Sequence, residues 1–190
     1  MGYDFFMVQR PAPQAGYAPL DPEQPEYFRF ASHAMEAVLT AMRRAGVVDE
    51  DTPEPDLSEH WPPPTIAEDR FDELDAFFQD GEELDEPPTR AEEELYRAAE
   101  ATVRRLAEVQ STDPHRVPAF KFCSNSDWWV SPAESRAIAS GLREALASAP
   151  ADLYPFGAGE GPPLESFVDL LAEWAAYNSV AAACGGYRVR

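Results

Sequence analysis

The sequence predicts an α+β protein: a small mixed or antiparallel sheet, made of the two terminal strands and a central hairpin, packed against about five helices. Three observations lead to this prediction. Both ends of the chain are short runs of β-favouring residues, the central run FKFCSNSDWWVS reads as two strands around a turn, and the segments between them repeat apolar residues at helical spacing. The 190 residues suffice for one domain with its own core, so we expect a single domain over residues 1–190.

The chain begins with a predicted strand. Residues 3–9 read YDFFMVQ, a continuous apolar run that ends at Arg10 and is typical of a strand buried on both faces. Five prolines between residues 11 and 25 exclude regular helix from the next segment. We therefore expect an extended connector there, anchored by Tyr17 and Leu20.

From Glu26 the pattern becomes helical. Apolar residues recur three and four positions apart as far as Met42, and Gly46 supplies the stop. His33 falls on or beside the apolar face of this predicted helix. We interpret it as a partly buried structural histidine rather than a metal ligand or a catalytic base.

The middle of the chain predicts an irregular loop followed by two helices. Between residues 47 and 64, prolines and acids leave a loop that we expect to contact the body through Leu57 and Trp61. Each following helix opens with a capping box, in which a threonine is followed three residues later by a glutamate. The two pairs are Thr65 with Glu68 and Thr89 with Glu92.

The central run predicts a hairpin followed by a helix. Residues 120–124 and 128–131 are β-favouring, and the residues between them are typical of a turn. Trp128 and Trp129 are adjacent on the second strand, so they should point to opposite faces, one of them into the core. Ser131 should then cap a helix whose first turn contains a proline and a capping glutamate. These three capping residues are Ser131, Pro132 and Glu134.

The last helix is predicted from Leu164, where apolar residues again recur at helical spacing. Gly185 and Gly186 should end it, because glycine readily adopts the left-handed conformation of a helix terminus. The closing residues YRVR then alternate Tyr187 and Val189 with arginines, as a strand with one buried face does.

Negative charge is concentrated in the middle of the chain. From residue 49 to residue 100 there are twenty Asp and Glu against Arg70, Arg90 and Arg97, which accounts for −17 of the total net charge of −20. We expect an acidic, proline-rich helical insertion at about residues 49–110. Such a block repels nucleic acid and anionic lipid and attracts basic protein surfaces.

No complete catalytic motif is present. Cys123, His115 and Asp127 could be arranged as a thiol triad, but a cysteine within an apolar strand is typical of a core residue. The run FGAGEG lacks the lysine and the hydroxyl of a phosphate loop, and the acidic runs lack the spacing of a calcium loop. We therefore assign no catalytic residue, no metal and no cofactor.

Cysteine usage and the missing targeting signals suggest an intracellular address. Cys123 and Cys184 are far apart, and we interpret them as two buried thiols rather than as a disulfide. The N-terminus shows neither a basic leader nor a cleavage site, and no apolar run reaches the about 18 residues of a membrane span. We expect a cytoplasmic protein.

Three segments carry a resemblance. The start MGYD, the segment SNSDWWVSPAES and the closing GGYRV resemble a loose group of small, mostly uncharacterised bacterial proteins that begin with MGYD and contain SN-x-x-W-x-V-[ST]-P-x-E. Some members look like neighbours of toxin and immunity genes, so the resemblance implies a binding role by association only. It brings no catalytic residue with it.

These observations favour a non-enzymatic protein that binds a basic protein partner through its acidic insertion, such as an immunity or antitoxin-like inhibitor or a nucleic-acid mimic. We expect no direct nucleic-acid or membrane binding. The expected partner-binding residues are Trp61, Glu68, Asp69, Asp72, Glu73, Asp75, Glu82 and Glu83. The alternative is a small enzyme or ligand-binding protein with a pocket near the Cys123–Trp129 hairpin. That candidate pocket comprises His33, Asn125, Asp127, Trp128, Trp129 and Tyr187.

Overall fold

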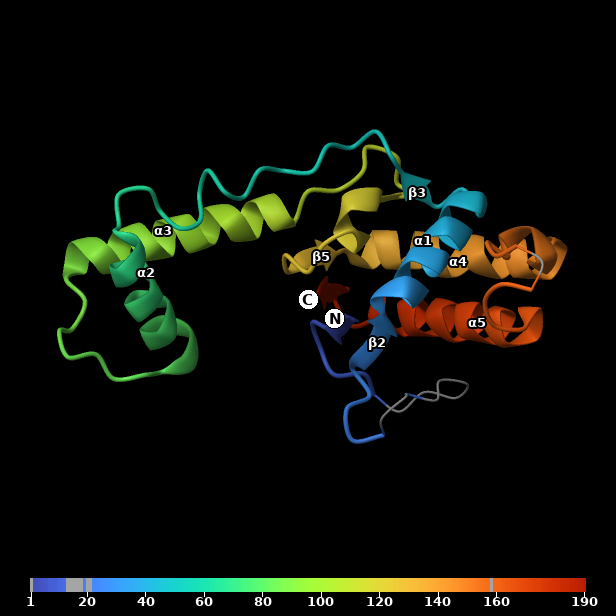
Figure 1. The fold of residues 1–190 in the computed structure, drawn as a ribbon, viewed down its shortest axis with the longest axis horizontal. Coiled ribbons are helices and arrows are strands. Elements are labelled where there is room, and N and C mark those ends of the chain that lie inside the picture. Colours follow the sequence, from blue (N-terminus) through green and yellow to red (C-terminus); the bar gives the residue numbers. More distant parts are fainter. Residues whose placement is uncertain (1, 13–18, 20–21, 158) are drawn as a thin grey trace. The chain divides into compact units, whose positions relative to one another are not determined.

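A computed structural model describes residues 2–12, 19, 22–157 and 159–190. These residues form two compact units (Figure 1), which we describe separately. Unit 1 comprises the chain up to Glu54 together with Gln110–Arg190, and unit 2 comprises Pro55–Val109. The expected connector anchors Tyr17 and Leu20 lie outside the described residues.

A four-stranded antiparallel sheet organises unit 1, with the strand order β2-β1-β6-β5. Its strands are β1 (Gly2–Met7), β2 (Tyr27–Ala31), β5 (Trp128–Val130) and β6 (Tyr187–Val189). The N-terminal strand β1 pairs with the C-terminal strand β6, so both ends of the chain lie in the middle of the sheet (Figure 1). The predicted α+β fold with both terminal strands in one sheet is confirmed, and the sheet is antiparallel rather than mixed.

One face of this sheet carries most of its buried side chains. Phe5, Phe28 and Tyr187 point to the same side of the sheet, because side chains alternate along each strand. They surround Trp174 of helix α5 (Leu164–Ala181), with ring centroids 4.9, 5.4 and 5.7 Å from it. Phe6 on the opposite side is only half-buried. The expectation that β1 is buried on both faces is therefore wrong.

The described part of unit 1 contains two further α-helices, α1 (Ser32–Arg44) and α4 (Pro132–Ser148). Helix α4 packs against α5, as Figure 1 shows. It begins with the predicted capping box, in which the Ser131 side chain accepts from the Glu134 N–H and the Glu134 carboxylate accepts from the Ser131 N–H. Gly46 follows α1 at a φ of 73°, so its predicted role as the stop of this helix is confirmed.

A pair of very short parallel strands joins the segment that precedes unit 2 to the segment that follows it. Strand β3 (Val48–Asp49) pairs with β4 (Val117–Pro118), and Val117 donates its N–H to the carbonyl of Val47 at 2.9 Å. The sequence analysis placed no strand here. Two-residue strands are too short to show a periodic pattern, so they leave no signal in the sequence.

The first predicted helix begins too early. Residues 27–31 form strand β2, and α1 starts only at Ser32. The residues YFRFA alternate aromatic and solvent-facing positions, with Phe28 and Phe30 buried and Arg29 exposed, which is the period of a strand. Tyr27, Phe30 and Ala31 also fit a helical spacing together with the residues that follow, so the periodicity was ambiguous over five residues.

The predicted central hairpin is wrong in its first half. Residues Ala119–Phe122 form a 3-10 helix, and β5 pairs with β6 instead of with a preceding strand. The turn of helix directs Lys121 into the interior and leaves Cys123 at the surface, so the expectation that Cys123 is buried is wrong. Cys184 is buried as expected, and both thiols are free.

Unit 2 consists of two α-helices, α2 (Glu68–Asp75) and α3 (Arg90–Ala107), with the π-helix Ala76–Asp80 continuing α2. Its core contains three buried side chains, Phe71, Leu74 and Tyr96. Partly buried apolar residues surround them, namely Trp61, Ile66, Phe78 and Leu84. In the described part of the chain, no helix combines the length and the apolar character that a membrane crossing requires.

The two capping boxes predicted for unit 2 have different outcomes. Thr89 and Glu92 form the complete reciprocal pair at the start of α3. Thr65 does not cap α2, which begins at Glu68 after the N-cap residue Ala67 and has no side-chain cap. Ile66 donates its N–H to the carbonyl of Pro63, so the residues after the prolines form a turn before the helix starts.

Candidate protein-binding surface

The negative charge of unit 2 is large for its size. Residues 55–109 contain seventeen Asp and Glu against five Arg. Their core of three fully buried side chains is small, so most of the acids must lie at the surface. Unit 2 therefore presents a strongly negative surface on a small apolar support.

The structure separates the predicted binding residues into two groups. Six of them have exposed side chains: Glu68, Asp69, Asp72, Glu73, Glu82 and Glu83. Trp61 and Asp75 are partly buried instead. The Trp61 ring packs against Phe71 and Tyr96, with centroids 5.0 and 5.2 Å away, and Asp75 accepts a hydrogen bond of 2.6 Å from the Tyr96 hydroxyl. These two residues support the surface from within.

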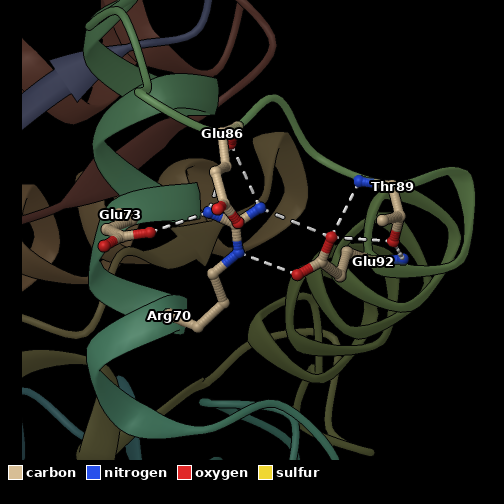
Figure 2. Close-up of polar contacts among 5 residues, drawn as sticks. All are labelled: Arg70, Glu73, Glu86, Thr89 and Glu92. Carbon is tan, nitrogen blue, oxygen red and sulfur yellow. Dashed lines mark hydrogen bonds and ion pairs between the residues drawn. The ribbon is translucent and has the colours of Figure 1, made fainter.

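Arg70 is the centre of a polar network that connects α2 with the loop before α3 (Figure 2). Its Nε donates to Glu92 Oε1 at 2.7 Å and its Nη1 to Glu73 Oε2 at 2.7 Å. Both terminal nitrogens also lie 3.3 Å from the carbonyl oxygen of Glu86. The guanidinium thus fixes two carboxylates and one loop carbonyl at once, and these hydrogen bonds raise the pKa of Arg70.

Glu92 joins this network to the start of α3. One carboxylate oxygen accepts from both the N–H and the hydroxyl of Thr89, each at 2.7 Å, while the other oxygen accepts from Arg70. The hydrogen bond from Arg70 and those from Thr89 lower the pKa of Glu92 from 4.5 to about 2. The helix cap is therefore held in its ionised form over the physiological pH range.

A groove lies beside Arg70 on unit 2, with a volume of about 540 Å³. Its walls are the second half of α2 and the loop that follows the π-helix. Five acids line it, namely Glu73, Glu82, Glu83, Asp85 and Glu86, together with Arg70, Ala76 and Leu84. Arg70 donates to the Glu73 carboxylate and to the backbone carbonyl of Glu86, so the carboxylates of Glu82, Glu83, Asp85 and Glu86 can receive cationic groups of a partner.

A second groove, of about 340 Å³, lies in unit 1 beside Asp49. The Asp49 carboxylate accepts from the hydroxyls of Ser111 at 2.5 Å and Thr52 at 2.6 Å, and from two backbone N–H groups. These bonds lower its pKa from 3.8 to about 2. Asp49 thus fastens the segment after β3 to the segment before β4. Among the described residues, no group of three acidic, histidine or cysteine side chains could hold a metal ion.

The residues of the alternative pocket do not line either groove. Trp128 and Tyr187 are core residues with 1% and 0% exposure, and the Tyr187 hydroxyl is buried without a hydrogen-bond partner. His33 is exposed on the first turn of α1, so its interpretation as a partly buried residue is wrong. The reason is that α1 starts at Ser32 instead of Glu26, six residues later than predicted, which moves His33 from the middle of a helix to its first turn.

The other pocket residues hold the sheet together. Asn125 donates to the carbonyl of Gly2 at 2.8 Å, and the Trp129 indole donates to the carbonyl of Gly185 at 3.1 Å. Asp127 has a φ of 57° and accepts from Arg190 Nε at 2.7 Å. The Asn125 and Asp127 contacts join the turn before β5 to the two ends of the chain, and the Trp129 contact joins β5 to the residues just before β6.

The environment of Cys123 is that of an unreactive thiol. Its Sγ donates to the carbonyl of Ala119 at 3.3 Å, and desolvation raises its pKa. A raised pKa disfavours the thiolate that nucleophilic catalysis requires. Asp127, the acid of the conceivable triad, is engaged with Arg190.

Sequence reasoning missed two important residues. Arg70 was counted only as a charge, yet it is the only arginine or lysine between residues 49 and 89, and an isolated arginine among acids is a candidate network centre. Lys121 is the only lysine of the chain, and its side chain is fully buried against Glu134. No signal in the sequence separated it from a surface lysine.

Together these features define an α+β protein whose second unit displays an acidic, arginine-anchored groove. Comparison of the chain with protein-family models, with curated proteins and with solved structures finds no match.

Proposed function

We propose that this protein binds a basic protein partner through the acidic surface of unit 2 and has no enzymatic activity of its own. In its concrete form, it is an immunity or antitoxin-like inhibitor that covers a basic active site, or a nucleic-acid mimic. Its negative field speeds association with a positive patch and repels nucleic acids and anionic lipid.

One observation carries this proposal: the acids of the loop 82–86 are exposed, while Arg70 holds the loop by donating to the backbone carbonyl of Glu86. A solubilising acidic face needs no such fixation. A binding surface gains from it, because a loop held in one conformation loses less entropy when a partner docks. The groove also offers Leu84 and Ala76 as apolar contacts for the aliphatic stem of an arginine or lysine.

The test compares two variants that lose the same charge. In the first, four loop acids become amides: Glu82→Gln, Glu83→Gln, Asp85→Asn and Glu86→Gln. In the second variant, four exposed acids of unit 1 become amides: Glu144→Gln, Glu165→Gln, Asp169→Asn and Glu173→Gln. Basic proteins retained from the source lysate by the wild-type chain at low salt are identified, purified and used to measure association rates.

We expect association with the loop variant to be about tenfold slower at low salt and to lose most of its salt dependence, while the unit 1 variant stays close to wild type. Equal slowing of both variants would show that only total charge matters, and would refute a localised binding surface. Association unaffected by the loop variant, or a lack of any basic partner for a folded chain, would refute the proposed function.

A further inference from the structure

The sheet of unit 1 has a second face, opposite Phe5 and Trp174, which we call the outer face. Strand pairing places Tyr27 beside Phe6, Phe6 beside Arg188, and Arg188 beside Trp129. One side chain from each strand thus forms a row across the sheet, in the order Tyr27, Phe6, Arg188, Trp129. The Phe6 and Tyr27 rings lie 5.0 Å apart within this row, which we call the aromatic row.

A second row on the outer face alternates in charge. Arg29 is paired with Asp4, and Asp4 exchanges two backbone hydrogen bonds of 2.7 and 2.8 Å with Arg190. Arg190 Nε in turn donates to Asp127. Across the sheet this charged row reads Arg29, Asp4, Arg190, Asp127, or plus, minus, plus, minus.

Side chains of both rows reach the surface, with Arg188 the least exposed of those with ion pairs, at 21%, and donating to the carbonyl of Asp127 at 3.1 Å. In the charged row, the side-chain exposure is 60% for Arg29, 32% for Asp4, 62% for Arg190 and 49% for Asp127. The aromatic rings of the other row are half-buried, and the guanidinium of Arg190 lies 5.9 Å from the Phe6 ring. The outer face therefore offers apolar area and fixed charges side by side.

We propose that the outer face binds a second copy of this chain, sheet against sheet, around a two-fold axis that runs along the strands between β1 and β6. This rotation reverses the strand order within each row. Arg29 then faces the partner's Asp127, and Asp4 faces the partner's Arg190. In the aromatic row, Tyr27 faces the partner's Trp129 and Phe6 faces the partner's Arg188, a cation–π pair.

Charge complementarity selects this occupant. A row that reads plus, minus, plus, minus is matched by its own reverse, and the same rotation that matches the charged row also pairs the aromatic row. A polyanion would meet Asp4 and Asp127, and a basic partner would meet the arginines. Aligned packing of two twisted sheets about 10 Å apart is a common geometry in proteins.

The size of the face predicts a weak dimer. Four strands about 4.8 Å apart give a face roughly 20 Å wide. Its strands are three to six residues long, which at about 3.3 Å per residue gives a length of roughly 10–20 Å. Such a face buries less than the about 800 Å² per partner of a standard interface. The net charge of −20 on each copy opposes association at low ionic strength. We therefore expect dimerisation at micromolar concentrations and at physiological salt.

Sedimentation velocity of the full chain, from low to high micromolar concentration, tests this. Asp4→Lys and Arg190→Glu each place two like-charged contacts in the dimer, because the two-fold axis repeats every contact. Each variant alone should dimerise about tenfold more weakly than wild type. In a mixture of the two variants, the positive charge introduced by Asp4→Lys in one chain faces the negative charge introduced by Arg190→Glu in the other, so association should return. Circular dichroism confirms that each variant is folded.

The control is Arg136→Glu, which changes the same charge on an exposed position of α4 and should leave dimerisation unchanged. A chain that stays monomeric over the whole concentration range overturns the proposal. A dimer that both variants leave intact, or that the mixture does not restore, overturns the sheet-to-sheet arrangement. If Asp4→Lys does not fold, comparing the dimerisation of Arg190→Glu with that of Arg136→Glu still shows whether the dimer depends on the outer face or only on the total charge of the chain.

Discussion

Replacing Lys121 by methionine should destabilise unit 1 more than any surface change of the same size. The Lys121 ammonium group is fully buried and donates to both carboxylate oxygens of Glu134, at 2.8 and 2.9 Å, and to the carbonyl of Trp129 at 2.7 Å. Glu134 is itself only 4% exposed. Methionine fills a similar volume but leaves the carboxylate without its counter-ion.

The magnitude follows from the cost of an uncompensated buried charge. Removing one partner of a buried pair typically costs about 3–5 kcal/mol, whereas replacing both partners is often neutral. Here burial outweighs the attraction of Glu134 and lowers the pKa of Lys121, so the pair itself contributes little net stability. We expect a loss of about 4 kcal/mol for Lys121→Met, and a loss below about 2 kcal/mol for the double variant with Glu134→Gln, because glutamine can still complete the capping box.

Urea unfolding measures both values, followed by tryptophan fluorescence because Trp128, Trp129 and Trp174 all belong to unit 1. Arg136→Met on the exposed side of α4 is the control and should change the free energy of unfolding by no more than about 0.5 kcal/mol. If Lys121→Met costs no more than this control, or the double variant is as unstable as the single one, the reasoning from an uncompensated charge is refuted.

Two further predictions concern the backbone and pH. Gly186→Ala should lower the free energy of unfolding in urea by about 3 kcal/mol, and Gly46→Ala by about 1 kcal/mol. Both glycines have a positive φ, but only at Gly186 would the added Cβ lie 2.1 Å from a backbone oxygen, that of Val130. Equal losses in the two variants would contradict this difference. The lowered pKa of Asp49 means that its stabilising effect is complete above its ordinary pKa of 3.8 and is lost as the pH falls towards about 2. Asp49→Asn should therefore flatten the fall in stability between these pH values relative to the exposed control Asp51→Asn, and an unchanged slope would contradict the assignment.

Helices were predictable where local signals agreed. A capping box depends on residues only three positions apart, so it can be recognised in the sequence. The start of α4 was predicted in this way from Ser131, Pro132 and Glu134, and the start of α3 from Thr89 and Glu92. The terminal strands were predictable as well, β1 from its nearly continuous apolar run and β6 from its alternation of apolar residues with arginines. These signals lie within a few residues, so the sequence alone carries the information needed to place the elements.

Errors arose where distant contacts decide the local structure. Residues 27–31 become a strand because β1 offers an edge for pairing, and residues 119–122 become a 3-10 helix that buries Lys121 against Glu134. Neither partner is near in sequence, so the apolar pattern could not reveal either outcome. For the candidate surface, composition located the acids, but the position of Arg70 at their centre depends on the packing of α2 against the start of α3.

The three segments that carry the resemblance meet in this one sheet, which gives their residues a structural reason. Asn125 holds Gly2, Asp127 holds Arg190, and Trp129 holds Gly185, so the turn before β5 is fastened to both terminal strands. Only glycine fits at position 186, because Val130 approaches it so closely. A motif that is fully engaged in closing the sheet has few groups left for chemistry. By contrast, the loop acids Glu82, Glu83, Asp85 and Glu86 of unit 2 are exposed at the groove, so we look for the specificity of this protein there.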